Sequence, residues 1–568
     1  MRRLIVSYGR VKVLRLAVVA LVLTTALLTL LHHRSRARQP SIYDYTEGRT
    51  SPWRDWKNKA NATTSTTRSA EADFLDHLVK KHGLTAEVTW SARVVQAKYG
   101  GSGRQSMTEV AGKFMPKEFA SVRVQDERLK LAVDRSALKL PVASGVRVDE
   151  VDASALLFGI STTYSRLTYL DNSLMRDWVR WLTDGNGKSN GASLLLTLQK
   201  SSDQEVIWVS DKLRSMGVDA TVVPSDGAGE SAYVDLVHKV KRHKEGNTRK
   251  SYVALVDDDI FFPSMGKLVQ KLSKFDPAKE HYIGAPSERS DWVIEYDKTL
   301  TYGGGAVFLT GPMLAQLTQL PCLAEPAERR EAGATPDSSP RQQKTTGGEQ
   351  WDLLLYECIT SHTAVDLHVL PSFYNPEEEQ LYSDHDRRVL VAEGYASGAQ
   401  PLTLHHYRNL HRFEAGKGHA VASACGEACF LQRFRFRDDW ILVNGYTLSH
   451  YPDGVDTVTL KKGPKKHKFQ DEDDQKVVFG RRIVVDGETG QKSDADGVKV
   501  VAWAGRKRTW RLLDARAGEG GEIWQAYVKR RGGGNSFGEI DERPKGDAVH
   551  AEEETTDKDS VVLLIWKP

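Results

Sequence analysis

The sequence is low in net charge and in cysteine. Its 568 residues carry a formal net charge of only +4, so the overall charge argues against a nucleic-acid partner. A basic cluster at 461–468 is followed at once by Asp471, Asp473 and Asp474, a pattern typical of a solvated loop. There are only four cysteines and none forms a CxxC pair, which excludes a zinc site built from two such pairs and a CxxC redox centre.

The cysteines that are present, with one further feature, indicate an oxidising compartment. Cys322, Cys358, Cys425 and Cys429 are an even number, which suits two structural disulfides. Asn61 opens an Asn-Ala-Thr sequon in a stretch rich in Ser and Thr, and such a sequon accepts N-linked glycans in secreted proteins, although the triplet is also common by chance. We therefore expect the body of the protein to lie in the lumen of the secretory pathway.

Long apolar runs are scarce, and the uncharged run at 16–31 stands out. It is slightly shorter than the ~20 residues that span hydrocarbon, but snorkelling of Lys12 and Arg15 would extend it. The rival interpretation is a cleaved signal peptide, and no small-x-small site follows the run directly. The missing cleavage site favours an uncleaved anchor, and the excess of basic residues before the run favours a type II orientation with a cytosolic tail at 1–15.

Composition divides the rest of the chain. Residues 32–70 are polar and basic without a hydrophobic period, as in a stem or linker. Residues 71–150 show weak amphipathic patches and are expected to form an accessory layer. Residues 151–430 have the pattern of a domain with strands and helices, although 323–349 is rich in Pro, Gly and Ser and predicts an insertion or lid. Short aromatic and β-branched runs at 431–568 predict a β-rich C-terminal appendage.

The first part of the central region has the pattern of an α/β fold. Near-continuous apolar runs at 155–160, 193–198 and 252–256 predict buried strands, 220–223 predicts a further strand, and amphipathic segments between them predict helices. Such alternation favours a mostly parallel sheet covered by helices. Ligands of open sheets bind beyond the carboxyl ends of the strands, and Asp257-Asp258-Asp259 follows the last of these runs directly.

Three adjacent carboxylates repel one another, and the repulsion grows in a partly dry site. A hard divalent cation such as Mn²⁺ or Mg²⁺ would make the arrangement favourable, because these ions prefer carboxylate oxygens and keep positions for phosphate oxygens. The alternative interpretation of Asp257-Asp258-Asp259 is a solvent-exposed acidic turn that caps the next helix.

Three later segments carry further candidate residues. The triplet Gly303-Gly304-Gly305 would let the backbone approach a ligand closely, or would serve a plain turn. Asp352 lies near the start of an apolar helix. Its carboxylate would either cap that helix or act as a general base for an acceptor hydroxyl. His405 and His406 end an extended segment. A neutral imidazole there could serve as an additional metal ligand, or the pair could be structural.

The order of these elements resembles the Fringe-like β1,3-glycosyltransferases, and most closely their fungal and plant relatives. The likeness covers about residues 151–430, in which the Asp-Asp-Asp strand is followed by Tyr282-Ile283-Gly284, Tyr302 with the glycine triplet, Asp352 and the histidine pair. The resemblance implies a GT-A nucleotide-sugar-binding fold, a membrane protein of the Golgi or endoplasmic reticulum, and inversion at the anomeric carbon of the donor.

The resemblance also implies roles for single residues. Asp259 would coordinate Mn²⁺, with His406 as the metal-binding histidine and His405 as its alternative. Asp257, Asp258 and the glycine triplet Gly303-Gly304-Gly305 would hold the nucleotide-sugar donor. Asp352 falls at the position of the catalytic base, and Cys322 and Cys358 match a family disulfide around it. The long Pro-rich segment between Cys322 and Asp352 departs from the pattern of the family.

The sequence therefore predicts a Mn-dependent inverting glycosyltransferase that moves a sugar from a UDP-sugar to a hydroxyl of a glycan or glycoprotein. UDP-galactose, UDP-N-acetylglucosamine and UDP-glucose all remain candidate donors. A catalytically silent carbohydrate-binding or scaffold protein on the same fold is the second hypothesis. A metal-dependent hydrolase ranks lower, because the sequence offers no second carboxylate cluster for a two-metal site.

Overall fold

The computed structural model describes most of the chain from residue 68 onward. The described ranges are 68–100, 104–105, 107–115, 118–227, 230–284, 306–323, 351–370, 381–383, 389–391, 398, 400–405, 407–408, 413–461, 475–478, 481–484, 497–503, 506–518, 520–533 and 557–568. They belong to one compact unit, Trp56–Pro568. The expected anchor at 16–31, Asn61, the glycine triplet 303–305 and His406 lie outside them. Among the described residues, no helix is long and apolar enough to span a membrane.

The central region forms an α/β sheet that is parallel at its centre. Its strands are β5 (Leu156–Thr163), β6 (Ser193–Gln199), β7 (Asp219–Ser225), β8 (Tyr252–Leu255), β9 (Tyr282–Gly284), β10 (Val307–Thr310) and β11 (Leu367–Val369). Within the described ranges these seven strands lie in the order β11-β9-β10-β8-β5-β6-β7. Strands β8, β5, β6 and β7 run parallel, and β10 is antiparallel to β8. The four strands predicted from apolar runs are thus confirmed as members of one sheet. Strands β5, β6 and β8 are almost wholly buried, whereas β7 lies at the edge of the sheet and is partly exposed.

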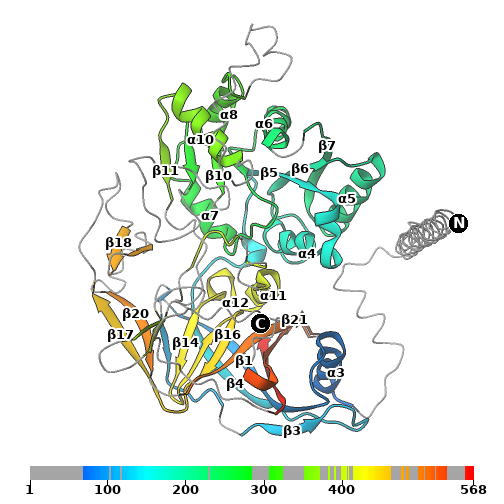
Figure 1. Cartoon of the computed structure of the whole chain (residues 1–568), viewed down its shortest axis with the longest axis vertical. Helices are drawn as coiled ribbons and strands as arrows, with labels where there is room; N and C mark the ends of the chain where they lie inside the picture. Colours follow the sequence, from blue (N-terminus) through cyan, green and yellow to red (C-terminus); the bar gives the residue numbers. More distant parts are fainter. Residues whose placement is uncertain are drawn as a thin grey trace, which may run out of the picture. The chain divides into compact units, whose positions relative to one another are not determined.

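Helices cover both faces of this sheet (Figure 1). They are α4 (Tyr164–Leu182), α5 (Asp203–Ser215), α6 (Glu230–Glu245), α7 (Met265–Leu272), α8 (Gly311–Leu317) and α10 (Trp351–His362). Side chains of α4, α5 and α7 pack in one core with Phe158 and Leu196, and those of α6, α8 and α10 pack in another with Leu157 and Leu195. Successive strand residues thus enter opposite cores, which is why the strands read as unbroken apolar runs.

A second sheet joins both ends of the described chain. Its strands are β1 (Glu87–Gly100), β2 (Thr108–Val110), β3 (Ala120–Arg123), β4 (Asp134–Ala143), β14 (Arg433–Phe436), β15 (Trp440–Val443), β16 (Thr447–His450), β21 (Arg508–Ala517), β22 (Ile523–Lys529) and β23 (Asp559–Lys567). For the part of the chain that is described, the order is β2-β14-β15-β16-β21-β22-β23-β1-β3, with β4 paired to β1. Figure 1 shows the blue and cyan strands β1 and β4 beside the yellow and orange ones.

Regions 71–150 and 431–568, which composition separates, therefore share one sheet. Strand β1 pairs in parallel with β23 over the register Val88↔Asp559 to Gln96↔Lys567. Thr85 N donates to Asp559 Oδ2 at 2.8 Å across a sequence separation of 474 residues. Helix α3 (Ala70–His82) covers one face of this sheet, and Phe74 lies edge-on to Trp524. Local hydrophobic patterns carry no information about pairing at such distances along the chain.

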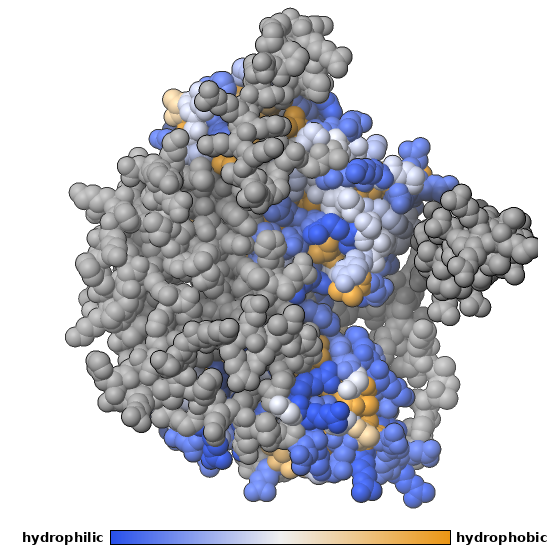
Figure 2. Space-filling view, in the orientation of Figure 1, coloured by the Kyte–Doolittle hydropathy of each residue, from blue (hydrophilic) through white to orange (hydrophobic). Residues whose placement is uncertain are grey.

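Smaller strands complete the described structure. Strands β12 (Leu381–Ser383), β13 (Val389–Val391), β17 (Val455–Lys461) and β20 (Gly497–Trp503) form one sheet, and β18 (Gln475–Val478) pairs with β19 (Arg481–Val484). On the face drawn in Figure 2 the described residues are mostly hydrophilic, and hydrophobic residues occur in small separate groups.

The two expected disulfides are confirmed. Cys322, just after α8, bonds to Cys358 in α10. Cys425 ends the short helix α12 (Ala422–Cys425) and bonds to Cys429 at the end of the 3₁₀ turn η6 (Glu427–Cys429). The first bond ties the helix that carries Asp352 to the turn that follows α8.

Candidate active site

The acidic triplet lies at the carboxyl end of β8, between β5 and β10 in the sheet. Strand β8 ends at Leu255, Val256 is fully buried, and the chain then turns through Asp258 and Asp259. All four residues of β8 are buried between the two helical layers. The triplet therefore stands where a buried strand delivers its side chains to the ligand-binding edge of an open sheet, as predicted.

Asp257 is held by two aromatic donors and a histidine. Tyr233 Oη donates to Asp257 Oδ1 at 3.0 Å, and Trp351 Nε1 donates to the same oxygen at 2.9 Å. His405 Nε2 lies 3.4 Å from the other oxygen, Oδ2. The rings of Tyr233 and Trp351 stack with centroids 4.2 Å apart and planes at 2°. This stack comes from α6 and α10 and fixes one face of the carboxylate, leaving Oδ2 toward the histidine.

The carboxylate of Asp258 accepts hydrogen bonds from side chains of β5 and α4. Thr162 Oγ1, from β5, donates to its carboxylate, and Arg166 in the first turn of α4 donates to both oxygens, with Nε at 2.6 Å from Oδ2. Trp178 Nε1 donates to the backbone oxygen of Asp258 at 3.0 Å. The side chain of Asp258 is 7% exposed, whereas that of Arg166 is 51% exposed. The arrangement shows Asp258 orienting Arg166 rather than presenting its own oxygens to solvent.

Sequence reasoning missed Arg166. The available signal was its position, because it follows the end of β5, the parallel neighbour of β8, and the carboxyl ends of parallel strands meet at one edge. Arg166 Nη2 also lies 3.9 Å from Asp259 Oδ2. A guanidinium thus stands beside the two carboxylates that follow Asp257.

Asp259 faces His405 because of a short backbone pairing. Phe261, two residues after Asp259, forms a bridge with Leu404, with N–H···O distances of 2.9 and 2.8 Å. That pairing brings His405 Nε2 to 3.1 Å from Asp259 Oδ1. The His405 side chain is only 3% exposed. The structure therefore places His405 against the triplet. His406, the predicted metal ligand, lies outside the described residues.

Burial and contacts act in opposite directions on these groups. Burial raises the pKa of Asp257, but hydrogen bonds and charge interactions with His405 and Trp351 outweigh it, and the net pKa lies below the usual value. Burial also raises the pKa of Asp258, and there it prevails over the opposing effect of Arg166. The Tyr233 hydroxyl has a strongly raised pKa, chiefly from burial and then from Asp257. Tyr233 therefore remains a proton donor to the carboxylate.

The chemistry of the donor set suits a divalent cation. Within the described residues, no group of three or more His, Cys, Asp or Glu side chains is arranged around a common metal position. His405 Nε2 nevertheless lies 3.1 Å from Asp259 Oδ1 and 3.4 Å from Asp257 Oδ2. Two neighbouring ligands at ~2.1 Å from an octahedral ion are about 3 Å apart. Imidazole nitrogen and carboxylate oxygen are donors that Mn²⁺ accepts, so these side chains fit such an ion.

Asp352 lies in the first turn of α10, next to Trp351. It is 6% exposed, and its Oδ1 accepts a hydrogen bond from Leu353 N at 3.0 Å. Because Trp351 donates to Asp257, the first turn of α10 is held against the acidic triplet. The Cys322–Cys358 disulfide fixes the same helix about two turns after Trp351. The structure thus brings His405, the triplet and the first turn of α10, which carries Asp352, to one end of the sheet.

If UDP binds here with Mn²⁺, as the sequence predicts, replacing Trp351 by phenylalanine is expected to weaken that binding about 10-fold, since a hydrogen bond to a charged group contributes ~1.5–3 kcal/mol. Phenylalanine keeps the stack on Tyr233 but loses the indole N–H bonded to Asp257. The matched control is Trp524→Phe, because Trp524 Nε1 donates to a carboxylate oxygen of Glu522 at 3.3 Å in the other sheet. Isothermal titration of both variants measures the difference, and equal UDP affinities would refute the role of Trp351.

Comparisons with known proteins give structural likeness alone. No protein-family model matches the chain, and no curated protein matches it. Mouse xyloside xylosyltransferase 1 is similar with a TM-score of 0.24 and 12% identity, over 38% of this chain and 84% of that one. The glycosyltransferase GlyE of Streptococcus pneumoniae TIGR4 gives a TM-score of 0.23 and 12% identity, over 38% of this chain and 45% of that one.

A third neighbour is the nucleoside-diphosphate-sugar pyrophosphorylase of Vibrio cholerae RC9, with a TM-score of 0.23 and 11% identity, over 38% of this chain and 91% of that one. The chain spans less than half the length of GlyE. Neighbours thus include glycosyltransferases and nucleotide-sugar pyrophosphorylases, and none of the sequence comparisons supports the Fringe-like resemblance. At these TM-scores the likeness identifies no family for this chain. What the chain does is therefore inferred from its own side chains.

Proposed function

We propose that this chain is an inverting glycosyltransferase that transfers a sugar from a UDP-sugar to a hydroxyl of a glycan or glycoprotein. The observation that carries the proposal is the convergence of Asp257, Asp259 and His405 at the carboxyl end of β8, with His405 Nε2 3.1 and 3.4 Å from the two carboxylates. A further carboxylate, Asp352, follows Trp351 in the first turn of α10, and Trp351 donates to Asp257. A cluster that can bind a cation suits a reaction in which the leaving group is an anion. A buried carboxylate nearby suits a nucleophile that has to lose a proton to a general base.

Asp259 and His405 are the residues proposed to hold Mn²⁺ or Mg²⁺, with Asp257 beside them. His406 remains the alternative histidine on the basis of the family resemblance. When bound, the cation supplies positive charge that neutralises the departing diphosphate. Tyr233 and Trp351 keep Asp257 in one orientation through their hydrogen bonds to Oδ1. Asp258 holds Arg166 at the rim of the site, where its half-exposed guanidinium faces the anionic donor.

In the proposed reaction, an acceptor hydroxyl oxygen attacks the anomeric carbon of the donor from the face opposite to the UDP. The new bond joins that oxygen to the anomeric carbon, and the bond from the anomeric carbon to the diphosphate oxygen breaks. The proton of the hydroxyl passes to the carboxylate of Asp352, which acts as general base. A single displacement of this kind inverts the configuration at the anomeric carbon.

The remaining expectations belong to the same proposal. A type II single-pass protein of the Golgi or endoplasmic reticulum membrane would hold residues 32–568 in the lumen, where nucleotide sugars and glycoprotein acceptors are present. The two disulfides, Cys322–Cys358 and Cys425–Cys429, suit that oxidising compartment. Gly303-Gly304-Gly305 are proposed to contact the donor, as the Fringe-like resemblance implies.

The test is a titration of the full-length protein with UDP in the presence of Mn²⁺ and of excess chelator. We expect binding that chelation removes, followed by transfer or slow hydrolysis when UDP-galactose, UDP-N-acetylglucosamine and UDP-glucose are each supplied. Absence of UDP binding under both conditions would overturn the proposal. Glycan binding without turnover of any UDP-sugar would instead support the carbohydrate-binding scaffold.

A further inference from the structure

The chain directly after the acidic triplet is held by residues from the segment that connects the two sheets. We call residues 260–266 the post-triplet segment. Phe261 packs edge-on against His419, with ring centroids 5.3 Å apart, and also pairs with Leu404. His419 Nε2 donates to the carbonyl oxygen of Pro263 at 3.0 Å. Burial lowers the pKa of His419 to about 3, so the ring stays neutral and keeps this bond at physiological pH.

Glu427 binds the far end of the same segment. Its carboxylate accepts hydrogen bonds from Ser264 Oγ at 2.8 Å, from Met265 N at 3.1 Å and from Gly266 N at 3.0 Å. The residue is 5% exposed. Met265 and Gly266 open α7, so the carboxylate satisfies backbone N–H groups that have no partner within the helix, and its negative charge suits that end of the helix dipole.

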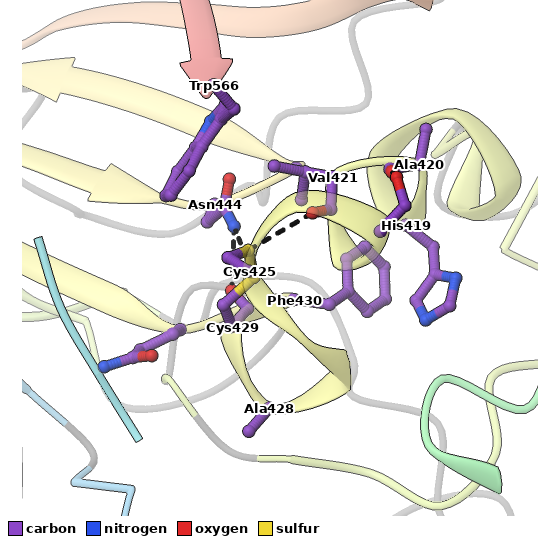
Figure 3. The surroundings of a disulfide bond; sticks show 12 residues. His419, Ala420, Val421, Cys425, Ala428, Cys429, Phe430, Asn444 and Trp566 are labelled. Atoms are coloured by element: carbon purple, nitrogen blue, oxygen red, sulfur yellow. Dashed lines mark hydrogen bonds between the residues drawn. A yellow bond between two sulfur atoms is a disulfide. The ribbon is translucent and has the colours of Figure 1, made fainter. Parts of the chain in front are cut away.

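The Cys425–Cys429 disulfide encloses Glu427. The two cysteines are four positions apart in the sequence, and Glu427 is the middle one of the three residues between them. In Figure 3 the disulfide lies between Asn444, whose Nδ2 donates to the backbone oxygen of Cys429 at 2.8 Å, and Val421, whose carbonyl oxygen lies 3.3 Å from Cys425 Sγ. The disulfide closes the short loop that carries Glu427, and the three hydrogen bonds from Ser264, Met265 and Gly266 hold its carboxylate against the start of α7.

We infer that Glu427 is a positioning residue that fixes the post-triplet segment and, through it, the distance between Asp259 and His405. This inference rests on the proposed function. The physical link is the register between Phe261 and Leu404. Asp259 precedes Phe261 by two residues and His405 follows Leu404 by one, so a shift of the post-triplet segment relative to Leu404 changes the separation of the two proposed ligands. Glu427 anchors the end of that segment, and the sheet that contains β14 and β15 thereby supports the metal site.

Glu427→Ala is expected to weaken Mn²⁺ binding by about 10-fold, the lower end of the loss seen when residues that orient metal ligands are removed. Glu427→Gln is expected to fall between it and the wild type, because the amide oxygen still accepts from Ser264 and Gly266 while the amide nitrogen opposes the N–H of Met265. Mn²⁺ affinity is measured on the full-length protein by electron paramagnetic resonance of the free ion, alongside the melting temperature and kcat and KM.

Asp559→Asn is the matched control. Asp559 is also buried and also accepts two backbone N–H groups, from Thr85 at 2.8 Å and from Arg531 at 2.8 Å, but in the sheet of β23 and away from the post-triplet segment. We expect it to lower the melting temperature with unchanged Mn²⁺ affinity. If Glu427→Ala lowers the melting temperature without weakening Mn²⁺ binding, the inference fails. If the wild-type protein binds no Mn²⁺, the proposed function itself has failed.

Discussion

Replacing Asp259 by alanine is expected to abolish Mn²⁺-dependent UDP binding, with a loss larger than the 10–100-fold that removal of outer-shell partners typically causes. Asp259 is the carboxylate nearest to His405 Nε2, at 3.1 Å, and its removal leaves the imidazole with the more distant oxygen of Asp257. Among the described residues, the side chain with a positive charge beside the triplet is Arg166, and Asp258 already pairs with it, so without the cation the charge of the diphosphate is poorly balanced. Calorimetric titration of the variant with UDP and Mn²⁺ measures the loss.

Asp219→Ala serves as the control for Asp259→Ala. Asp219 begins β7, and its carboxylate accepts a hydrogen bond from Ser193 Oγ at the start of β6. It therefore lies at the amino end of the parallel strands, opposite to the triplet, and the variant should bind UDP as the wild type does. Unchanged UDP affinity in Asp259→Ala, with Mn²⁺ present, would show that UDP binding does not depend on a metal ion held by Asp259.

Asp352→Asn is expected to slow sugar transfer by about 10²–10⁴-fold, the usual contribution of a general base, with UDP affinity changed by less than about 2-fold. Asparagine has the same shape and its amide oxygen still accepts the hydrogen bond from Leu353 N, so the first turn of α10 keeps its place. It cannot take a proton from the acceptor hydroxyl. Comparing kcat with the Mn²⁺-dependent dissociation constant of UDP separates the two effects.

Glu357→Gln is the control on the same helix, because Glu357 lies in α10 and well past its first turn. Its kcat and UDP affinity should both match the wild type. An equal loss of transfer and of UDP binding in Asp352→Asn would mean that Asp352 supports the donor site rather than acting as a base.

Much of the α/β sheet is predictable from the sequence, since a strand buried on both faces has to be apolar throughout. The runs at 155–160 and 252–256 obey that rule and become β5 and β8. The position of the acidic triplet follows from the same rule, because the polar residues begin where the strand leaves the core. The second sheet follows no such rule, since β1 and β23 pair across almost the whole chain.

The contacts between side chains of the site also depend on pairing between distant parts of the chain, so the sequence does not predict them. Adjacent residues of an extended segment point to opposite sides, so the choice between His405 and His406 depends on the register of Leu404 with Phe261. No local pattern encodes that register. Likewise, the binding of Asp257 by Tyr233 and Trp351 requires two helices from distant parts of the sequence to meet above the same strand end.

The central claim is that His405 and the carboxylates of the triplet hold one divalent cation. Electron spin echo spectroscopy of Mn²⁺ bound to the full-length protein with UDP tests it most directly, because the echo is modulated by an imidazole nitrogen bonded to the ion. We predict one such nitrogen in the wild type and in His406→Ala, and none in His405→Ala. Bound Mn²⁺ without a coupled nitrogen, or a nitrogen signal that persists in His405→Ala, would contradict the account.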